Sequence, residues 1–278
     1  MRRVFWRWKQ RCKILDFQRK ETYDIDDLLQ IMKLLRAPGG CPWDREQTHK
    51  SIRNCFIEET YEAVEAIDGD DPVLLQEELG DVLLQVVFHA ELEAEAGRFV
   101  FADVVDGIAK KMVQRHPHVF GTVVVNGTED VLTNWDAIKK KTKDQKTQTE
   151  VLQSVSKALP ALMRSQKVQQ KAAKVGFDWP DVSGALDKVA EETAELREAI
   201  RTDVQENCSE ELGDLLFSVV NVSRFIGVNP EQSLSEACEK FIARFAKVEQ
   251  LAKERGMDMA SAGIDALDKL WDEAKIMK

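Results

Sequence analysis

The sequence predicts an all-α protein made of two tandem helical domains. Apolar residues recur at helical spacing through most of the chain, whereas strand-like alternation is limited to residues 122–125, between two glycines. One acidic motif also occurs twice, at residues 58–81 and 191–214, with the same internal spacing. A chain of 278 residues is long enough for two hydrophobic cores, so the repeat indicates two domains.

The expected domain boundaries follow the repeat and the composition. Residues 1–20 hold eight Lys or Arg and one acid, interleaved with aromatic residues, and are expected to form a disordered basic extension. A targeting or membrane-surface segment is the alternative. The N-terminal domain is expected at 21–138 and the C-terminal domain at 158–278. Residues 139–157 lack apolar periodicity and predict a polar linker.

Amphipathic periodicity predicts the helices, and breakers or caps predict their ends. Residues 37–40 supply breakers in succession, Gly97 caps the second acidic helix, and Asn229-Pro230 makes a good helix start. Gly80 and Gly213 lie inside acidic helices at a cost of about 1 kcal/mol each relative to alanine, which predicts a close helix crossing. Helices of the N-terminal domain are expected at 24–36, through both acidic segments to about 96, and at 103–115. Those of the C-terminal domain are expected at 159–174, 183–201, 206–225, 230–255 and 264–278.

The repeated acids predict metal sites. Residues three apart lie on one side of a helix, so antiparallel pairing across a turn at 69–72 gathers four carboxylates, which repel one another. A hard divalent cation removes that cost, and oxygen ligands suit Mg²⁺, with Mn²⁺ as the alternative. A solvated acidic face is less favoured, because residues 82–88 make the second helix apolar on most sides. The predicted ligands are Glu59, Glu62, Glu78 and Asp81, and Glu192, Glu195, Glu211 and Asp214.

Four further glutamates remain once the metal ligands are assigned. Glu58, Glu77, Glu191 and Glu210 are predicted to be catalytic, either by orienting or deprotonating a water molecule or by holding a second metal. No Ser, Cys or His recurs in a position to act as a nucleophile, which favours direct attack by water.

Cations and tryptophans also recur. Lys111 with Arg115, and Lys240 with Arg244, are spaced four apart on predicted helices, so each pair is predicted to bind adjacent phosphates. A Trp-Asp motif recurs at 135–136 and 271–272. The residues predicted to bind substrate are Lys240, Arg244, Trp271, Lys188, Lys111, Arg115 and Trp135.

The paired acidic segments resemble the MazG nucleoside triphosphate pyrophosphohydrolases, whose mark is Glu-Glu-x-x-Glu followed by Glu-x-x-Asp. The resemblance runs from about Tyr23 to the C-terminus. It implies two MazG-like domains of the four-helix-bundle type, a homodimer, and hydrolysis of a nucleoside triphosphate (NTP or dNTP) between its α- and β-phosphates. It also implies that the C-terminal half is the main catalytic one, and that the repeated tryptophan stacks on the base, although packing at the end of a bundle competes with that role. The loops around Trp43 and Trp179 resemble segments that line the family's site, where these rings either flank the base or plug the helix pair.

Both halves retain the acids, the Lys/Arg pair and the tryptophan. We therefore expect both halves to bind metal and the N-terminal half to serve dimerisation as well. Two other classes of protein compete with the hydrolase. A di-iron helical bundle requires Glu-x-x-His motifs, which the repeat lacks. A non-catalytic helical module that senses nucleotides or binds partners predicts nucleotide-dependent stabilisation without turnover.

Composition and charge bear on the partners and the cellular compartment of the protein. A net charge of −10 argues against a nucleic-acid binder with a broad basic face. Five scattered cysteines without a Cys-x-x-Cys pair predict reduced thiols in a cytoplasmic protein. No apolar run approaches the length of a membrane span, so no membrane partner is expected.

Overall fold

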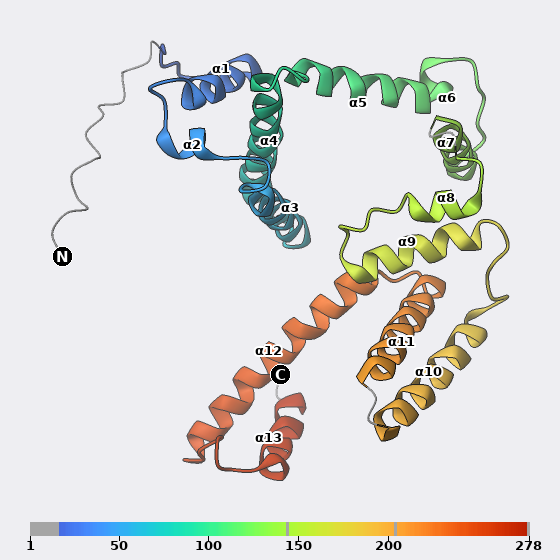
Figure 1. Cartoon of the computed structure of the whole chain (residues 1–278). Helices are drawn as coiled ribbons and strands as arrows, with labels where there is room; N and C mark the ends of the chain where they lie inside the picture. The colour runs from blue at the N-terminus through green and yellow to red at the C-terminus, as the bar shows by residue number, and fades with distance from the viewer. Residues whose placement is uncertain (1–16, 143–144, 203–204, 277–278) are drawn as a thin grey trace. The chain divides into compact units, whose positions relative to one another are not determined.

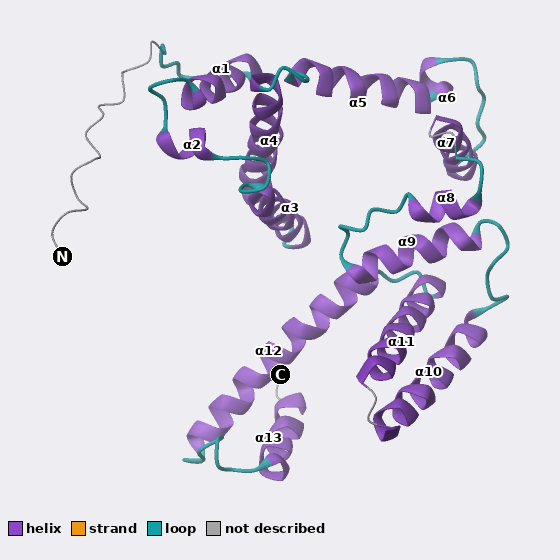
Figure 2. Ribbon diagram, in the orientation of Figure 1, coloured by secondary structure: helices purple, strands orange, loops and turns teal. Residues whose placement is uncertain are grey.

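The computed structural model describes residues 17–142, 145–202 and 205–276, and every regular element within these ranges is an α-helix (Figure 2). Two compact units make up the chain, Met1–Ile138 and Lys139–Lys278, coloured from blue to green and from yellow-green to red in Figure 1. The predicted all-α, two-domain fold is confirmed. Residues 1–16 of the predicted basic extension lie outside the described residues.

Unit 1 is built around an antiparallel pair, α3 and α4, with α1 and α5 packed on α4. Its core lies between α1, the start of α3 and the second half of α4, where Met32, Ile52, Val87 and Phe88 are buried together. The helices are α1 (Ile25–Arg36), α2 (Pro42–Glu46), α3 (Arg53–Asp68), α4 (Pro72–Glu95), α5 (Phe101–Arg115), α6 (Pro117–Phe120) and α7 (Thr128–Thr142), the last of which runs past the unit boundary.

Local sequence explains several helix ends in unit 1. The α1 helix starts with a capping box, in which Asp24 accepts from the Asp27 backbone N–H at 3.0 Å and Asp27 accepts from that of Asp24 at 3.1 Å. Gly97 follows α4 with a φ of 69°, a conformation that glycine adopts without steric cost, as predicted for a cap. Residues 122–125 are irregular, and Val124 is 84% exposed, so the short alternation there does not form a strand.

Unit 2 contains a second antiparallel pair, α10 and α11, and a separate pair, α12 and α13. The α9 helix packs against both α11 and α12. Asn229 caps α12 through its side chain and Pro230 is the first helical residue, as predicted. The helices are α8 (Gln148–Gln153), α9 (Ala161–Ala173), α10 (Val182–Thr202), α11 (Gln205–Phe225), α12 (Pro230–Glu254) and α13 (Ile264–Ile276).

The α8 helix lies inside the stretch expected to be a polar linker. Its start is a capping box between Thr147 and Glu150, each of which accepts a hydrogen bond from the other's backbone N–H at 3.2 Å. Because capping depends on polar residues, it can form a short helix where apolar periodicity is missing. The linker region is therefore partly helical.

The explanation expected for Gly80 and Gly213 is wrong within the described chain. A Cβ atom added at either position meets no heavy atom within 4 Å, so no helix of the same chain crosses closely there. Both glycines lie instead on open faces of α4 and α11, beside Leu79 and Leu212, which are 54% and 48% exposed.

Among the described residues, none of the helices has the length and apolar character that crossing a bilayer requires.

Candidate active site

The first acidic cluster lies across the α3–α4 pair of unit 1. Gly69 ends α3, and Asp71 caps α4 by accepting the backbone N–H groups of Val73 and Leu74, both at 3.0 Å. This short connection reverses the chain, so the acidic faces of the two helices meet. Carboxylate oxygens of three residues then lie within 4.8 Å of one another, those of Glu59, Glu78 and Asp81.

The second acidic cluster lies across the α10–α11 pair of unit 2. Carboxylate oxygens of Glu192, Glu195 and Glu211 lie within 4.8 Å of one another. The Glu192 side chain is only 4% exposed. The structure thus brings together three of the four predicted ligands in each unit. Glu62 and Asp214 lie outside these groups of three.

The electrostatics of both clusters suit a cation. Burial, followed by repulsion from Asp81, Glu62 and Glu78, raises the pKa of Glu59. Burial and then the neighbouring carboxylates also raise the pKa values of Glu78 and Glu195. Such groups favour any ligand that neutralises them, and a set of oxygen donors this close matches a hard divalent cation. The residues present therefore fit Mg²⁺ or Mn²⁺.

Lys188 distinguishes the second cluster from the first. Its ammonium lies 2.5 Å from Glu192 Oε1 and 2.9 Å from Glu191 Oε1, and these contacts raise the pKa of Lys188. The corresponding residue in the first repeat is Cys55, three positions before Glu58. The sequence predicted that Lys188 binds substrate, but it was not predicted that the first repeat lacks this lysine. Alignment of the two repeats at their constant spacing reveals it.

The other four predicted glutamates border the clusters. Glu58, Glu77, Glu191 and Glu210 are all exposed, so their carboxylates are accessible to water.

The Lys/Arg pairs and the repeated tryptophans lie on other helices. In unit 2, α12 presents exposed Lys240 and half-buried Arg244, whose guanidinium lies over the ring of Trp271 on α13, 5.0 Å from the ring centre. In unit 1, Lys111 is exposed, and the guanidinium of Arg115 on α5 lies over Trp135 of α7 at 5.1 Å.

Within unit 2 the cations and the acids occupy different parts of the fold. Figure 1 shows α12 diverging from the α10–α11 pair, and the extensive contacts of α12 in the described chain are with α13 and α9. The acids of α10–α11 and the Arg244–Trp271 pair are therefore not gathered by one helix pair.

Both halves of the chain match one known domain family. The model of the MazG nucleotide pyrophosphohydrolase domain matches twice, over residues 47–120 and 182–249. The chain is 44% identical over 251 residues to the nucleoside triphosphate pyrophosphohydrolase/pyrophosphatase MazG of Thermotoga maritima, covering 90% of this chain and 95% of that protein. It is 43% identical over 254 residues to the nucleoside triphosphate pyrophosphohydrolase of Escherichia coli K12, covering 90% and 97%.

This chain belongs to the MazG family. The two MazG matches include both acidic clusters and both Lys/Arg pairs, whereas Trp135 and Trp271 lie beyond their ends.

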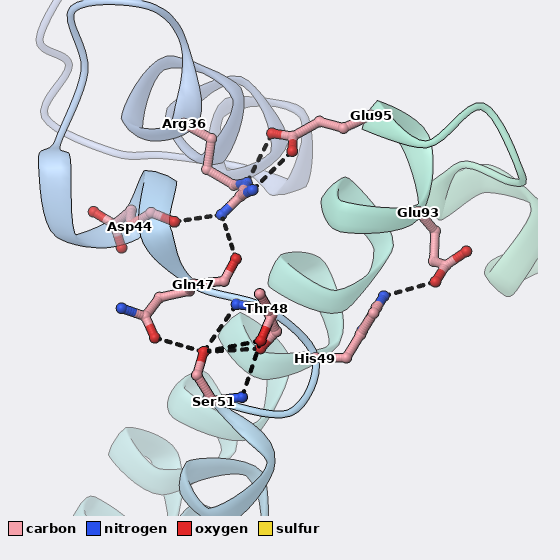
Figure 3. A network of polar contacts seen from close by, with 8 residues as sticks. All are labelled: Arg36, Asp44, Gln47, Thr48, His49, Ser51, Glu93 and Glu95. Atoms are coloured by element: carbon pink, nitrogen blue, oxygen red, sulfur yellow. Dashed lines mark hydrogen bonds and ion pairs between the residues drawn. The ribbon is translucent and has the colours of Figure 1, made fainter.

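The segment around Trp43 in unit 1 was expected to be a loop, but Trp43 lies in the short helix α2, and a polar network holds this segment (Figure 3). The guanidinium of Arg36 bonds both carboxylate oxygens of Glu95 at 2.7 Å and donates to the backbone carbonyls of Asp44 and Gln47. Beside it, His49 lies 2.6 Å from Glu93. This network fastens α2, which carries Trp43, to the end of α4, and the Trp43 side chain is 59% exposed.

The corresponding segment of unit 2, around Trp179, is a loop held by a different ion pair. Asp178 pairs with Arg224 at the end of α11. Trp179 packs on the first turn of α10, where a Cβ on Gly184 would lie 2.7 Å from the indole. This contact favours the packing alternative for Trp179.

Proposed function

We propose that this MazG protein hydrolyses nucleoside triphosphates between the α- and β-phosphates, releasing nucleoside monophosphate and pyrophosphate. The observation that carries the proposal is the pair of three-carboxylate clusters, each within a MazG domain match. Relatives that cover 90% of the chain are named nucleoside triphosphate pyrophosphohydrolases, which supports the same activity here.

Each cluster would hold Mg²⁺, with Mn²⁺ as a substitute. In unit 2 the ligands would be Glu192, Glu195 and Glu211, and in unit 1 Glu59, Glu78 and Asp81. When bound, the metal would offset the negative charge of the phosphates and polarise them towards attack.

The side chains around the cluster of unit 2 supply the rest of the chemistry. Lys188 lies against Glu192 and Glu191, so its ammonium is placed to donate a hydrogen bond to a phosphate beside the metal ligands. Lys240 and Arg244 bind outer phosphates as a point charge and a planar fork. One of Glu191 and Glu210, both exposed, accepts the proton of the attacking water.

A second copy of the chain would complete the site. In unit 2 the cations on α12 lie apart from the acids on α10 and α11, and α11 presents an open apolar stripe of Leu212, Leu216 and Val219, each exposed by 46–49%. A face of this kind is typical of an unfilled helix-bundle interface. The protein would therefore be a homodimer in which α10–α11 pairs associate, with unit 1 contributing in the same way. We place it in the cytoplasm, in keeping with the free thiols of Cys41, Cys55, Cys208 and Cys238.

The test is product analysis with purified full-length protein, Mg²⁺ and a panel of NTPs and dNTPs. Monophosphate and pyrophosphate in equal amounts are expected, with loss of turnover in Glu195→Gln. Glu198→Gln, one turn along the same helix at an exposed position, is the matched control and should retain turnover. Diphosphate and orthophosphate as products would contradict the proposed bond, and nucleotide-induced stabilisation without turnover would support the sensing module.

The same assay should follow orthophosphate, because the name of the T. maritima relative includes a pyrophosphatase.

A further inference from the structure

The arginine–tryptophan pairs, Arg115–Trp135 and Arg244–Trp271, are built alike in both units. In each, a guanidinium lies over an indole ring, at 5.1 Å and 5.0 Å, and the pairs join α5 to α7 and α12 to α13. These distances are within the range of a favourable cation–π interaction. Two independent occurrences of the same geometry indicate that the contact is a feature of the repeat.

The indole of Trp271 is also held by its other neighbours. Phe241, one turn before Arg244 on α12, contacts the ring at 5.0 Å, and Phe245 stacks on Phe241. Trp271 further packs against the core cluster of α12 and α13, which includes Leu270. The ring is therefore fixed by packing, and one of its surfaces is occupied by the guanidinium.

The indole of Trp135 is held in a comparable way. His116 meets the ring of Trp135 edge-on, with ring centres 5.1 Å apart, and His116 Nδ1 lies 2.6 Å from the carbonyl oxygen of Met112. Met112 and His116 occupy the positions of Phe241 and Phe245. The neighbours differ between the units, but the arginine on the indole is retained.

We infer that Trp271 and Trp135 are positioning residues that hold Arg244 and Arg115 ready for a phosphate group. The inference rests on the proposed function, in which these arginines bind the triphosphate. A free arginine side chain loses much rotamer freedom when it binds, and an arginine already resting on a fixed ring loses less. The guanidinium edge stays available for a planar, bidentate contact with phosphate oxygens while its face rests on the indole.

This role predicts effects different from those of base stacking. If the tryptophan acts through the arginine, its loss weakens binding of any polyphosphate equally, whatever base is attached. If it stacks on the base, its loss affects purine nucleotides most and leaves a base-free polyphosphate unaffected.

The test is calorimetric binding of inorganic tripolyphosphate with Mg²⁺ to the full-length protein, for Trp271→Leu, Arg244→Ala and the double variant. Trp271→Leu should weaken tripolyphosphate binding about 5- to 20-fold and raise the KM for ATP and CTP by one common factor, with little change in kcat. The double variant should bind no more weakly than Arg244→Ala alone. Trp271→Phe, which keeps an aromatic face in the same core, should restore most of the binding.

Phe225→Leu is the matched control, because Arg224 lies over the Phe225 ring at 4.4 Å in the same unit but outside the proposed phosphate site. It should leave tripolyphosphate binding unchanged. Additive losses in the double variant, a loss confined to purine nucleotides, or no tripolyphosphate binding by the wild type would overturn the inference. Coupled tripolyphosphate binding without NTP turnover would support it while contradicting the hydrolase.

Discussion

Lys188 and Glu192 form an ion pair of 2.5 Å within one turn of α10, and the position of Lys188 in the first repeat is occupied by Cys55. The acidic cluster of unit 2 is therefore partly neutralised by the chain itself, whereas that of unit 1 has a thiol at the same place. The two repeats share their acids, their Lys/Arg pairs and their tryptophans in sequence, but they differ at this position and in which three acids come together.

Replacing Lys188 by Met should reduce kcat/KM for nucleoside triphosphates about ten- to a hundredfold, because a charge-assisted phosphate contact is lost and two glutamates lose their partner. Steady-state kinetics of pyrophosphate release measures this. Lys167→Met, an exposed lysine on α9, and Cys55→Met in unit 1 are the controls, and both should retain activity. An unchanged kcat/KM in Lys188→Met would show that Lys188 does not bind the substrate.

The sequence could predict the parts of the site that follow from spacing along a helix and from the repeat. Spacing alone places Glu192 and Glu195 on one side of α10, and the constant separation of the two acidic segments predicts their meeting across a helix pair. The same local rules predicted the start of α12, since caps depend on residues next to the helix end.

Contacts between distant residues were beyond such rules. Arg36 meets Glu95 and Arg244 meets Trp271 only because whole helices pack together, and no local pattern specifies that packing. The roles first predicted for Arg244 and Trp271 were separate, one for phosphate and one for a base, because sequence spacing does not show that the two side chains touch.

Metal binding should show two classes of site per chain. Titration of Mn²⁺, followed by electron paramagnetic resonance, should lose one class in Glu59→Gln/Glu78→Gln and the other in Glu192→Gln/Glu211→Gln. Retention of both classes in either double variant would contradict the assignment. Asp68→Asn, at the end of α3 and exposed, is a charge control that should retain both classes.

Replacing Glu59 by Gln should stabilise unit 1 when no metal is present, whereas the wild type should be the more stable protein when Mg²⁺ is bound. The pKa of Glu59 is raised by burial and by its acidic neighbours, so its ionisation opposes folding, and stability falls as pH rises above about 4.5, the ordinary value. In the presence of EDTA at pH 7, Glu59→Gln should therefore raise the melting temperature of unit 1 by about 2–4 °C. With Mg²⁺ the wild type should be the more stable protein, because only it gains the full binding free energy. A lower melting temperature of the variant in EDTA would contradict the repulsion.

Acid should destabilise unit 1 in two steps. Burial, and then the charge of His49, lowers the pKa of His89, so the unfolded chain takes up this proton first and stability falls as pH drops below about 6.5. His49 Nδ1 lies 2.7 Å from His89 Nδ1, a contact that requires at least one unprotonated nitrogen. The hydrogen bonds of Arg98 and His49 lower the pKa of Glu93 to about 2, so the contribution of Glu93 is present above about 4.5 and is lost as pH falls towards 2.

Thermal melts between pH 7 and 3 test both steps. His89→Phe should abolish the first decline, and Glu93→Gln the second. Unit 2 contains no histidine and is therefore an internal control. Its melting transition should show no decline from histidine protonation between pH 7 and 5.5. A first decline that persists in His89→Phe would assign it to other groups.

Arg36 should contribute strongly to the stability of unit 1, because its side chain is only 6% exposed and serves both a carboxylate and two backbone carbonyls. Arg36→Met removes the guanidinium, which lies over the Phe88 ring at 5.3 Å, and leaves the carbonyls of Asp44 and Gln47 without this donor. The free energy of unfolding of unit 1 should fall by about 2–4 kcal/mol, measured by urea denaturation. Lys110→Met, which removes an ion pair exposed on both sides, should produce no measurable change. Equal effects of the two variants would show that the contacts of the buried Arg36 side chain in Figure 3 are no stronger than a surface pair.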